Sequence, residues 1–314
     1  MENTLQHITL HQFKLQSGNT LDLNLSYQIF GAELFSAPII LINHALTGNS
    51  NVSGENGWWK TLVGDQKIVD TTNFTVLCFN IPGNGYDGFF IDHCEDFTTK
   101  DIANIFLEGL FSLNIKKLYA MVGGSLGGAI GWEMLSIKPD LTEKFIPIAC
   151  DYKTSDWLHA QCLVQQFLLK QNEKPLEKAR IHAMLCYRTP ESLNLRFNNE
   201  WIQDQQIRKS HDWLNFHGKS LNERFSLKAY HLMNQLLMTI NTDSEQLINI
   251  TAEVHLISVD SDLFFPAFEM KNCFEFLHKT KGNVFYHEIK SIHGHDAFLM
   301  EYEQLNNILQ KILN

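Results

Sequence analysis

The sequence predicts an α/β fold in which a mostly parallel central sheet is covered by helices on both faces and interrupted by a helical insertion. Short apolar runs, typical of buried strands, alternate with segments of helical periodicity in both halves of the chain. From residue 151 to about residue 249 the strand signals stop and only helical periodicity remains. We therefore expect a core domain formed by residues 1–150 and 252–314, with residues 151–251 inserted as a helical cap over the site.

Apolar patterning predicts the first strands. Residues 8–30 are typical of an antiparallel hairpin, because apolar and polar side chains alternate along residues 21–29 and SGN at residues 17–19 supplies a turn. The continuous apolar runs at residues 39–42 and 74–79 predict strands that are buried on both faces of the sheet.

A helix and two further strands are expected next. Thr98 can cap a helix together with Asp101, and an apolar face follows it. The apolar runs at residues 118–122 and 145–149 predict strands, with a helical pattern starting between them near Ala129. A strand, a crossover helix and a second strand form the unit from which parallel sheets are built.

The second half of the chain contains the insertion and the end of the sheet. Two helical stripes stand out in the insertion, at residues 158–168 and 232–240. Strand patterns resume at residues 254–259 and 284–289, and an apolar stripe at residues 305–312 predicts a last helix.

Composition narrows the classes of function. The 314 residues are 44% hydrophobic and carry a formal net charge of -10, which argues against nonspecific binding to nucleic acid or to an anionic membrane. No apolar run approaches the roughly 18 residues of a membrane span. No signal peptide is visible at the N-terminus, and the six cysteines are scattered without a CxxC pair. We therefore expect a cytoplasmic protein with reduced, buried thiols.

The turn after residues 118–122 has the pattern of a nucleophile elbow. Gly123, Ser125 and Gly127 form GxSxG between a predicted strand and a predicted helix. Such a turn is so sharp that the residues two before and two after the serine must be nearly free of side chain. A glycine-rich turn that binds phosphate is the alternative. No lysine follows the glycines, which argues against a nucleotide P-loop.

Two later loops offer the partners that a nucleophilic serine needs. An imidazole held by a carboxylate removes the serine proton, and after such an elbow the chain order is serine, acid, histidine. The acid is Asp260 or Asp262, and Asp262 is favoured because it lies further into its loop and can better reach an imidazole. The base is His293 or His295, and spacing alone leaves both open. A metal site formed by these histidines and Asp262 is a weaker alternative, because no further ligand cluster appears.

An oxyanion hole requires two backbone N–H groups. Leu126, directly after the serine, supplies one, and Leu46, in the loop that follows the strand at residues 39–42, supplies the other. The Leu46 side chain is equally compatible with plain core packing, so only its backbone is assigned.

Five motifs between about residues 39 and 300 extend this pattern. They are NHALTG at residues 43–48, GWW at 57–59, GGSLGG at 123–128, DLFFP at 262–266 and GHDAFL at 294–299. Together they resemble homoserine O-acetyltransferases, which have the α/β-hydrolase fold. HALTG, GWW and GHDAFL are far more specific than GxSxG. Residues 179–189 and 216–225 are also similar to cap segments of this family.

The resemblance implies specific roles. Ser125 is the nucleophile, Asp262 and His295 are its partners, and Leu46 and Leu126 are the oxyanion donors.

The resemblance also implies that Arg180 and Asp296 hold the amino-acid substrate and that Tyr187 lines its pocket. Homoserine has a carboxylate and an ammonium group, which an arginine and a carboxylate complement. The plain alternatives are a solvated helix charge for Arg180, and for Asp296 the cap of a helix beginning near Ala297.

The implied reaction moves an acetyl group from acetyl-CoA to the hydroxyl of L-homoserine through a seryl acyl-enzyme, in methionine biosynthesis. A homoserine O-succinyltransferase, a serine O-acetyltransferase, an esterase or thioesterase, and a non-catalytic binding module are alternatives. The resemblance further implies no permanently bound cofactor and a homodimer formed through the cap helices. The chain departs from the family in a trimmed cap and in a shorter, more aromatic loop at residues 80–90, both of them where an acyl donor would enter.

Overall fold

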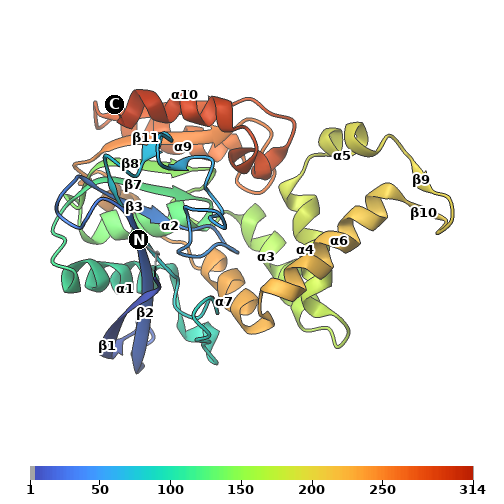
Figure 1. Ribbon diagram of the computed structural model, residues 1–314, viewed down its shortest axis with the longest axis horizontal. Helices are drawn as coiled ribbons and strands as arrows, with labels where there is room; N and C mark the ends of the chain where they lie inside the picture. Colours follow the sequence, from blue (N-terminus) through green and yellow to red (C-terminus); the bar gives the residue numbers. More distant parts are fainter. Residues whose placement is uncertain (1–3, 314) are drawn as a thin grey trace.

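The computed structural model describes residues 4–313, and its centre is an eight-stranded sheet (Figure 1). The strand order is β1-β2-β6-β3-β7-β8-β11-β12, with β1 and β2 antiparallel to their neighbours and every pair from β6 onward parallel. The strands are β1 (Gln6–Lys14), β2 (Thr20–Gly31), β3 (Ile39–Asn43), β6 (Thr75–Phe79), β7 (Leu118–Gly124), β8 (Thr142–Ile148), β11 (Glu253–Val259) and β12 (Val284–Ile289). The predicted mostly parallel sheet is confirmed.

Alternating side chains of the central strands point into two separate cores. On β3, Ile39 and Leu41 belong to one cluster, whereas Ile40 and Ile42 belong to the other. The first cluster is completed by α1 (Thr99–Ser112), α2 (Leu126–Ile137) and α9 (Ala267–His278), and the second by α10 (Tyr302–Leu313). Burial on both faces explains why these strands are continuous apolar runs rather than alternating ones.

The start of α1 shows the predicted cap. The hydroxyl of Thr98 accepts the backbone N–H of Asp101 at 3.2 Å, and the Asp101 carboxylate accepts the backbone N–H of Thr98 at 2.8 Å. The same carboxylate also accepts the N–H of Gln16 at 2.7 Å, so this cap ties the β1–β2 turn to the helix layer.

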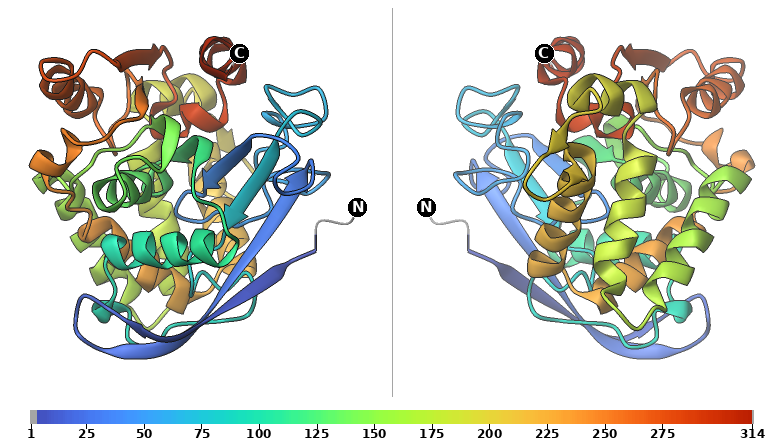
Figure 2. Two further views of the ribbon diagram at one scale, coloured as in Figure 1. Left: turned by 90° about the vertical axis from the view of Figure 1, so that its left-hand side faces the viewer. Right: turned by 90° about the vertical axis from the view of Figure 1, so that its right-hand side faces the viewer.

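The insertion forms a helical cap beside the sheet, and this cap faces the viewer in the right-hand view of Figure 2. Its helices are α3 (Asp156–Leu169), α4 (Pro175–Tyr187), α5 (Pro190–Phe197), α6 (Lys209–Arg224), α7 (Leu227–Met238) and α8 (Ser244–Leu247). The expectation that this segment contains no strand is wrong at one place, where β9 (Trp201–Ile202) and β10 (Ile207–Arg208) pair as a small antiparallel ribbon. Strands of two residues are too short to show an alternating pattern.

Two further features concern the chain as a whole. Over residues 4–313 no helix has the length and apolar character that crossing a bilayer demands. All six cysteines are free, and four of them are buried, while Cys94 and Cys186 are partly exposed.

Candidate active site

The predicted elbow is present between β7 and α2. Ser125 has φ 54° and ψ -127°, a strained conformation for a residue with a side chain, which costs about 1–3 kcal/mol. An ideal Cβ on Gly123 would lie 2.4 Å from the carbonyl oxygen of Gly127, so the turn closes too tightly for any other residue at that position. The Ser125 N–H donates to the carbonyl of Ile148 at 2.8 Å, which anchors the strained residue to β8.

Three side chains from different parts of the chain converge at this turn. The Nε2 atom of His295 lies 2.9 Å from the hydroxyl oxygen of Ser125, and its Nδ1 atom lies 2.7 Å from Oδ2 of Asp262. When Nδ1–H donates to the carboxylate, Nε2 is left to accept the serine proton. All three residues are at most 4% exposed.

The surroundings of Asp262 and His295 hold both in place. The second carboxylate oxygen of Asp262 accepts the backbone N–H groups of Phe264 at 2.7 Å and Phe265 at 2.9 Å. The imidazole of His295 lies among the rings of both phenylalanines and of Phe298, with centroids 5.1 to 5.7 Å away. These rings exclude water from the imidazole and fix its orientation.

The two competing residues have other partners. Asp260 accepts the backbone N–H of Ser291 at 3.0 Å and lies 3.6 Å from the ammonium of Lys290. His293 turns toward the cap, where its Nδ1 atom lies 2.9 Å from the hydroxyl of Ser192. Neither residue takes part in the Ser125 cluster, and residues 4–313 contain no group of three or more His, Cys, Asp or Glu side chains arranged for a metal ion.

The two predicted oxyanion donors lie on segments that touch, the loop after β3 and the first turn of α2. The side-chain amide of Asn43 donates to the carbonyl of Gly127 at 3.2 Å, which joins the loop of Leu46 to the first turn of α2. Within residues 4–313, the N–H groups of Leu46 and Leu126 have no protein acceptor. Both remain available for a negatively charged oxygen.

His44 ties the loop of Leu46 to the segment that follows β6. Its Nδ1–H donates to the carbonyl of Ala45 at 2.8 Å, and its Nε2 accepts the N–H of Ile81 at 3.0 Å. Burial lowers the pKa of His44 to about 4, so the ring is neutral at physiological pH and this bonding pattern is stable. The sequence motif at residues 43–48 assigns only the backbone N–H of Leu46 and gives no sign of this role for His44.

Tyr187 packs against the imidazole of His295, Arg180 lies over the Tyr187 ring, and Asp296 follows His295 in the chain. The guanidinium of Arg180 lies 5.6 Å from the ring centroid of Tyr187, and that ring lies 5.4 Å from the imidazole of His295. Burial raises the pKa of Asp296, and the charge of Arg180 opposes this rise most strongly. The helix expected to begin near Ala297 is instead a 3-10 helix, η2 (Gly294–Leu299), with His293 at its cap position, so Asp296 is not a helix cap.

A residue that sequence reasoning missed is Arg188, one position after Tyr187. It is 5% exposed, and its guanidinium lies 3.9 Å from the carboxylate of Asp296. An arginine in a helical insertion looks like a solvated charge in the sequence, and no local pattern marks it as buried.

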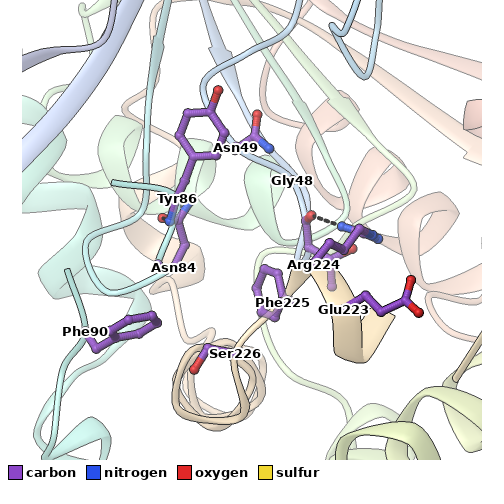
Figure 3. A pocket seen from close by; sticks show the side chains of 11 residues that line it. Gly48, Asn49, Asn84, Tyr86, Phe90, Glu223, Arg224, Phe225 and Ser226 are labelled. Carbon is purple, nitrogen blue, oxygen red and sulfur yellow. Dashed lines mark hydrogen bonds between the residues drawn. The ribbon is translucent and has the colours of Figure 1, made fainter. Parts of the chain in front are cut away.

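A cleft of about 300 Å³ lies beside the loop that follows β3 (Figure 3). One wall is the loop after Leu46, and the other is the junction of α6 and α7, from which Arg224 donates to the carbonyl of Thr47 at 3.2 Å. Tyr86 and Phe90, from the short aromatic loop at residues 80–90, complete the lining.

The arrangement has the parts needed for acyl transfer. A buried hydroxyl faces an imidazole, the imidazole is held by a carboxylate, and two backbone N–H groups are available for an oxyanion. Arg180, over the Tyr187 ring, and Asp296, the residue after His295, provide charges of opposite sign for a zwitterionic ligand.

Comparisons with known proteins show the fold and the family of this chain. The family described as alpha/beta hydrolase fold matches residues 38–299. A homoserine O-acetyltransferase of Cyclobacterium marinum is 30% identical over 302 residues, which cover 87% of this chain and 84% of that protein. Among solved structures, homoserine O-acetyltransferase from Bacillus anthracis has a TM-score of 0.87 at 18% identity, covering 100% of this chain and 98% of its own. Esterase E22 has a TM-score of 0.88 at 18% identity, covering 99% of this chain and 100% of its own.

Proposed function

The chain belongs to the homoserine O-acetyltransferase family of the α/β-hydrolase fold, and from this premise we propose that it transfers an acetyl group from acetyl-CoA to L-homoserine through an acylated Ser125. The observation that carries the proposal is the imidazole of His295, which lies within hydrogen-bonding distance of both Ser125 and Asp262. No permanently bound cofactor takes part, because the thioester itself activates the acetyl group.

In the first half-reaction, His295 removes the proton of Ser125 and the serine oxygen attacks the thioester carbonyl carbon. The negative charge on the carbonyl oxygen is stabilised by the N–H groups of Leu46 and Leu126. The carbon–sulfur bond then breaks, and the leaving thiolate takes the proton from His295. The products are acetylated Ser125 and free CoA.

In the second half-reaction, the hydroxyl of homoserine attacks the acyl-enzyme while His295 removes its proton. We assign Arg180 to the substrate carboxylate, Asp296 to the substrate ammonium and Tyr187 to the pocket wall. The Tyr187 ring packs against the imidazole, Arg180 lies over that ring, and the charge of Arg180 acts on Asp296. The serine oxygen leaves with the proton from His295. Water is the competing acceptor, and the buried site under the cap disfavours it. The product, O-acetylhomoserine, would enter methionine biosynthesis.

The donor and the acceptor are tested by assaying two acyl donors, each with homoserine, with serine and with water alone as the acceptor. We expect the highest kcat/KM with acetyl-CoA and homoserine, compared with succinyl-CoA as donor and with serine or water as acceptor, and no turnover by Ser125→Ala. A preference for succinyl-CoA as donor, or for free serine as acceptor, would change the assigned substrates and leave the role of Ser125 as nucleophile in place. Acetyl-CoA hydrolysis at a rate unaffected by homoserine would identify an esterase or thioesterase instead.

We also propose that the enzyme is a cytoplasmic homodimer joined through its cap helices. Trp157, Val164 and Phe167 lie on one side of α3 and are 40% to 58% exposed, an apolar stripe that a second cap would cover. The free cysteines are compatible with a reducing compartment. Sedimentation equilibrium tests the dimer: the unchanged protein should sediment as a dimer and Phe167→Asp as a monomer.

A further inference from the structure

Arg188 lies between α4 and α5 of the cap and contacts several side chains inside the protein. Its Nε and Nη2 atoms donate to the hydroxyl oxygen of Ser192 at 3.1 and 2.6 Å. Nη2 also donates to Nδ1 of His293 at 3.0 Å. Nη1 donates to Sδ of Met300 at 3.5 Å and lies 3.9 Å from Oδ2 of Asp296. Burying a guanidinium is costly unless its donors are paired, so this set of partners determines where the side chain lies.

The partners of Arg188 lie on both sides of His295 in the chain. His293 is two residues before the imidazole, and Asp296 is the residue after it. A single guanidinium from the cap therefore touches both ends of the short turn that carries the base.

Neighbouring cap residues hold the same turn. The hydroxyl of Thr189 donates to the carbonyl of Ile292 at 2.5 Å. Gly294 has φ +65° and lies so close to Tyr187 that an ideal Cβ would be 2.7 Å from the Tyr187 carbonyl oxygen. The end of α4 and the start of α5 thus form the wall against which the His295 turn is folded.

We propose that Arg188 is a positioning residue for His295, which fixes the imidazole against Ser125 by holding His293 and Asp296 together from the cap. The inference rests on the proposed role of His295 as the base. Arg188 also links the base to the amino-acid site, since Asp296 is held by Arg188 on one side and assigned to the amino-acid ammonium on the other. An ammonium group can replace the guanidinium only in part, because the three nitrogens of the planar fork contact four side chains, those of Ser192, His293, Asp296 and Met300.

The test measures how fast a fluorophosphonate probe modifies Ser125, a reaction that needs the serine and its base but no amino acid or acyl-CoA. The full chain is compared with Arg188→Met, Arg188→Lys and Ser192→Ala, and intact mass gives both rate and endpoint. We expect Arg188→Met to react about 10- to 100-fold more slowly, as for a base displaced by a fraction of an ångström to about 1 Å. The modification rates of Arg188→Lys and Ser192→Ala should lie between those of Arg188→Met and the unchanged protein.

The endpoint separates positioning from misfolding. A misfolded fraction lowers the number of chains modified, whereas a misplaced base lowers the rate and leaves one adduct per chain. Arg196→Met is the matched control, because Arg196 lies over the same Trp213 ring as Arg188 but, among residues 4–313, makes no contact with the His295 turn. Its rate should equal that of the unchanged protein.

Two results would overturn the inference in distinguishable ways. Modification of Arg188→Met at the unchanged protein's rate would remove the role of Arg188 and leave the proposed function standing. If Arg188→Met does not fold, modification of both Arg188→Lys and Ser192→Ala at the unchanged protein's rate would likewise remove the role of Arg188. A complete lack of modification in the unchanged protein would overturn the serine chemistry itself, and the role of Arg188 with it.

Discussion

The backbone of Gly127 lies so close to Asn43 that an ideal Cβ on the glycine would be 2.2 Å from the asparagine carbonyl oxygen. This contact brings the loop of Leu46 against the first turn of α2, where Leu126 lies. The distance between the two oxyanion donors therefore depends on the absence of a side chain at one position.

Gly127→Ala should damage catalysis more than stability alone explains. The new methyl group meets backbone, which cannot rotate away, so the Leu46 loop must shift. Loss of one oxyanion donor typically costs about 100- to 1,000-fold in kcat, and we expect a loss in this range with little change in the KM for acetyl-CoA. Gly282→Ala is the control, because a Cβ there meets no atom within 4 Å. Equal kcat in both variants would contradict the assigned oxyanion hole.

Asp262→Asn should lower kcat by about 10,000-fold, because an amide stabilises the wrong tautomer of the imidazole. Asp260→Asn should leave kcat nearly unchanged, since its carboxylate contacts Lys290 and the backbone of Ser291 instead. Steady-state rates of the two variants decide between the acids. A larger loss in Asp260→Asn would mean that the acid is wrongly assigned.

Arg180→Met should raise the KM for homoserine by about 10- to 100-fold, since a charge-assisted hydrogen bond contributes about 1.5–3 kcal/mol. The rate of serine acylation by acetyl-CoA should stay unchanged, because Arg180 acts only on the acceptor in this proposal. Rapid-quench measurement of acylation, together with the KM for homoserine, separates the two effects. An unchanged KM would assign Arg180 to the cap surface rather than to the substrate.

The free energy of unfolding should decrease as the pH is lowered, because His44 is buried as a neutral ring. Burial lowers the pKa of this imidazole from 6.5 to about 4, so the unfolded chain binds the proton more readily than the folded one. The stability that the neutral ring contributes is complete above pH 6.5 and is lost as the pH falls through about 4. Over this window the contribution amounts to about 3 kcal/mol.

His44→Gln tests this pH dependence by urea unfolding between pH 7 and pH 4. The variant has no group that titrates at this position, so its free energy of unfolding should depend less steeply on pH, whatever its absolute stability. Parallel curves for the variant and the unchanged protein would show that His44 is not the group responsible.

Sequence patterns located the site because its three residues follow the ends of strands. Ser125, Asp262 and His295 each follow a predicted strand, and parallel strands bring their carboxyl ends to the same edge of the sheet. Spacing could not separate His293 from His295, since both occupy one loop. The left-handed conformation of Gly294 between them turns the first toward the cap and the second toward Ser125.

The features that sequence patterns missed depend on contacts between distant segments. Arg188 resembles a solvated charge until α4 and α5 are placed against the His295 turn. The β9–β10 ribbon, and the two-residue strands β4 (Val63–Gly64) and β5 (Val69–Asp70), are too short for any period to appear. Local patterns predict elements that bury a long face, and do not predict pairings that arise only from tertiary packing.

The most direct test of the central claim is the intact mass of the protein after incubation with acetyl-CoA in the absence of an amino acid. We predict a gain of one acetyl group, located by peptide mapping on Ser125 and discharged as O-acetylhomoserine when homoserine is added. An unmodified Ser125 during full turnover, or full acetyl transfer by Ser125→Ala, would contradict the account.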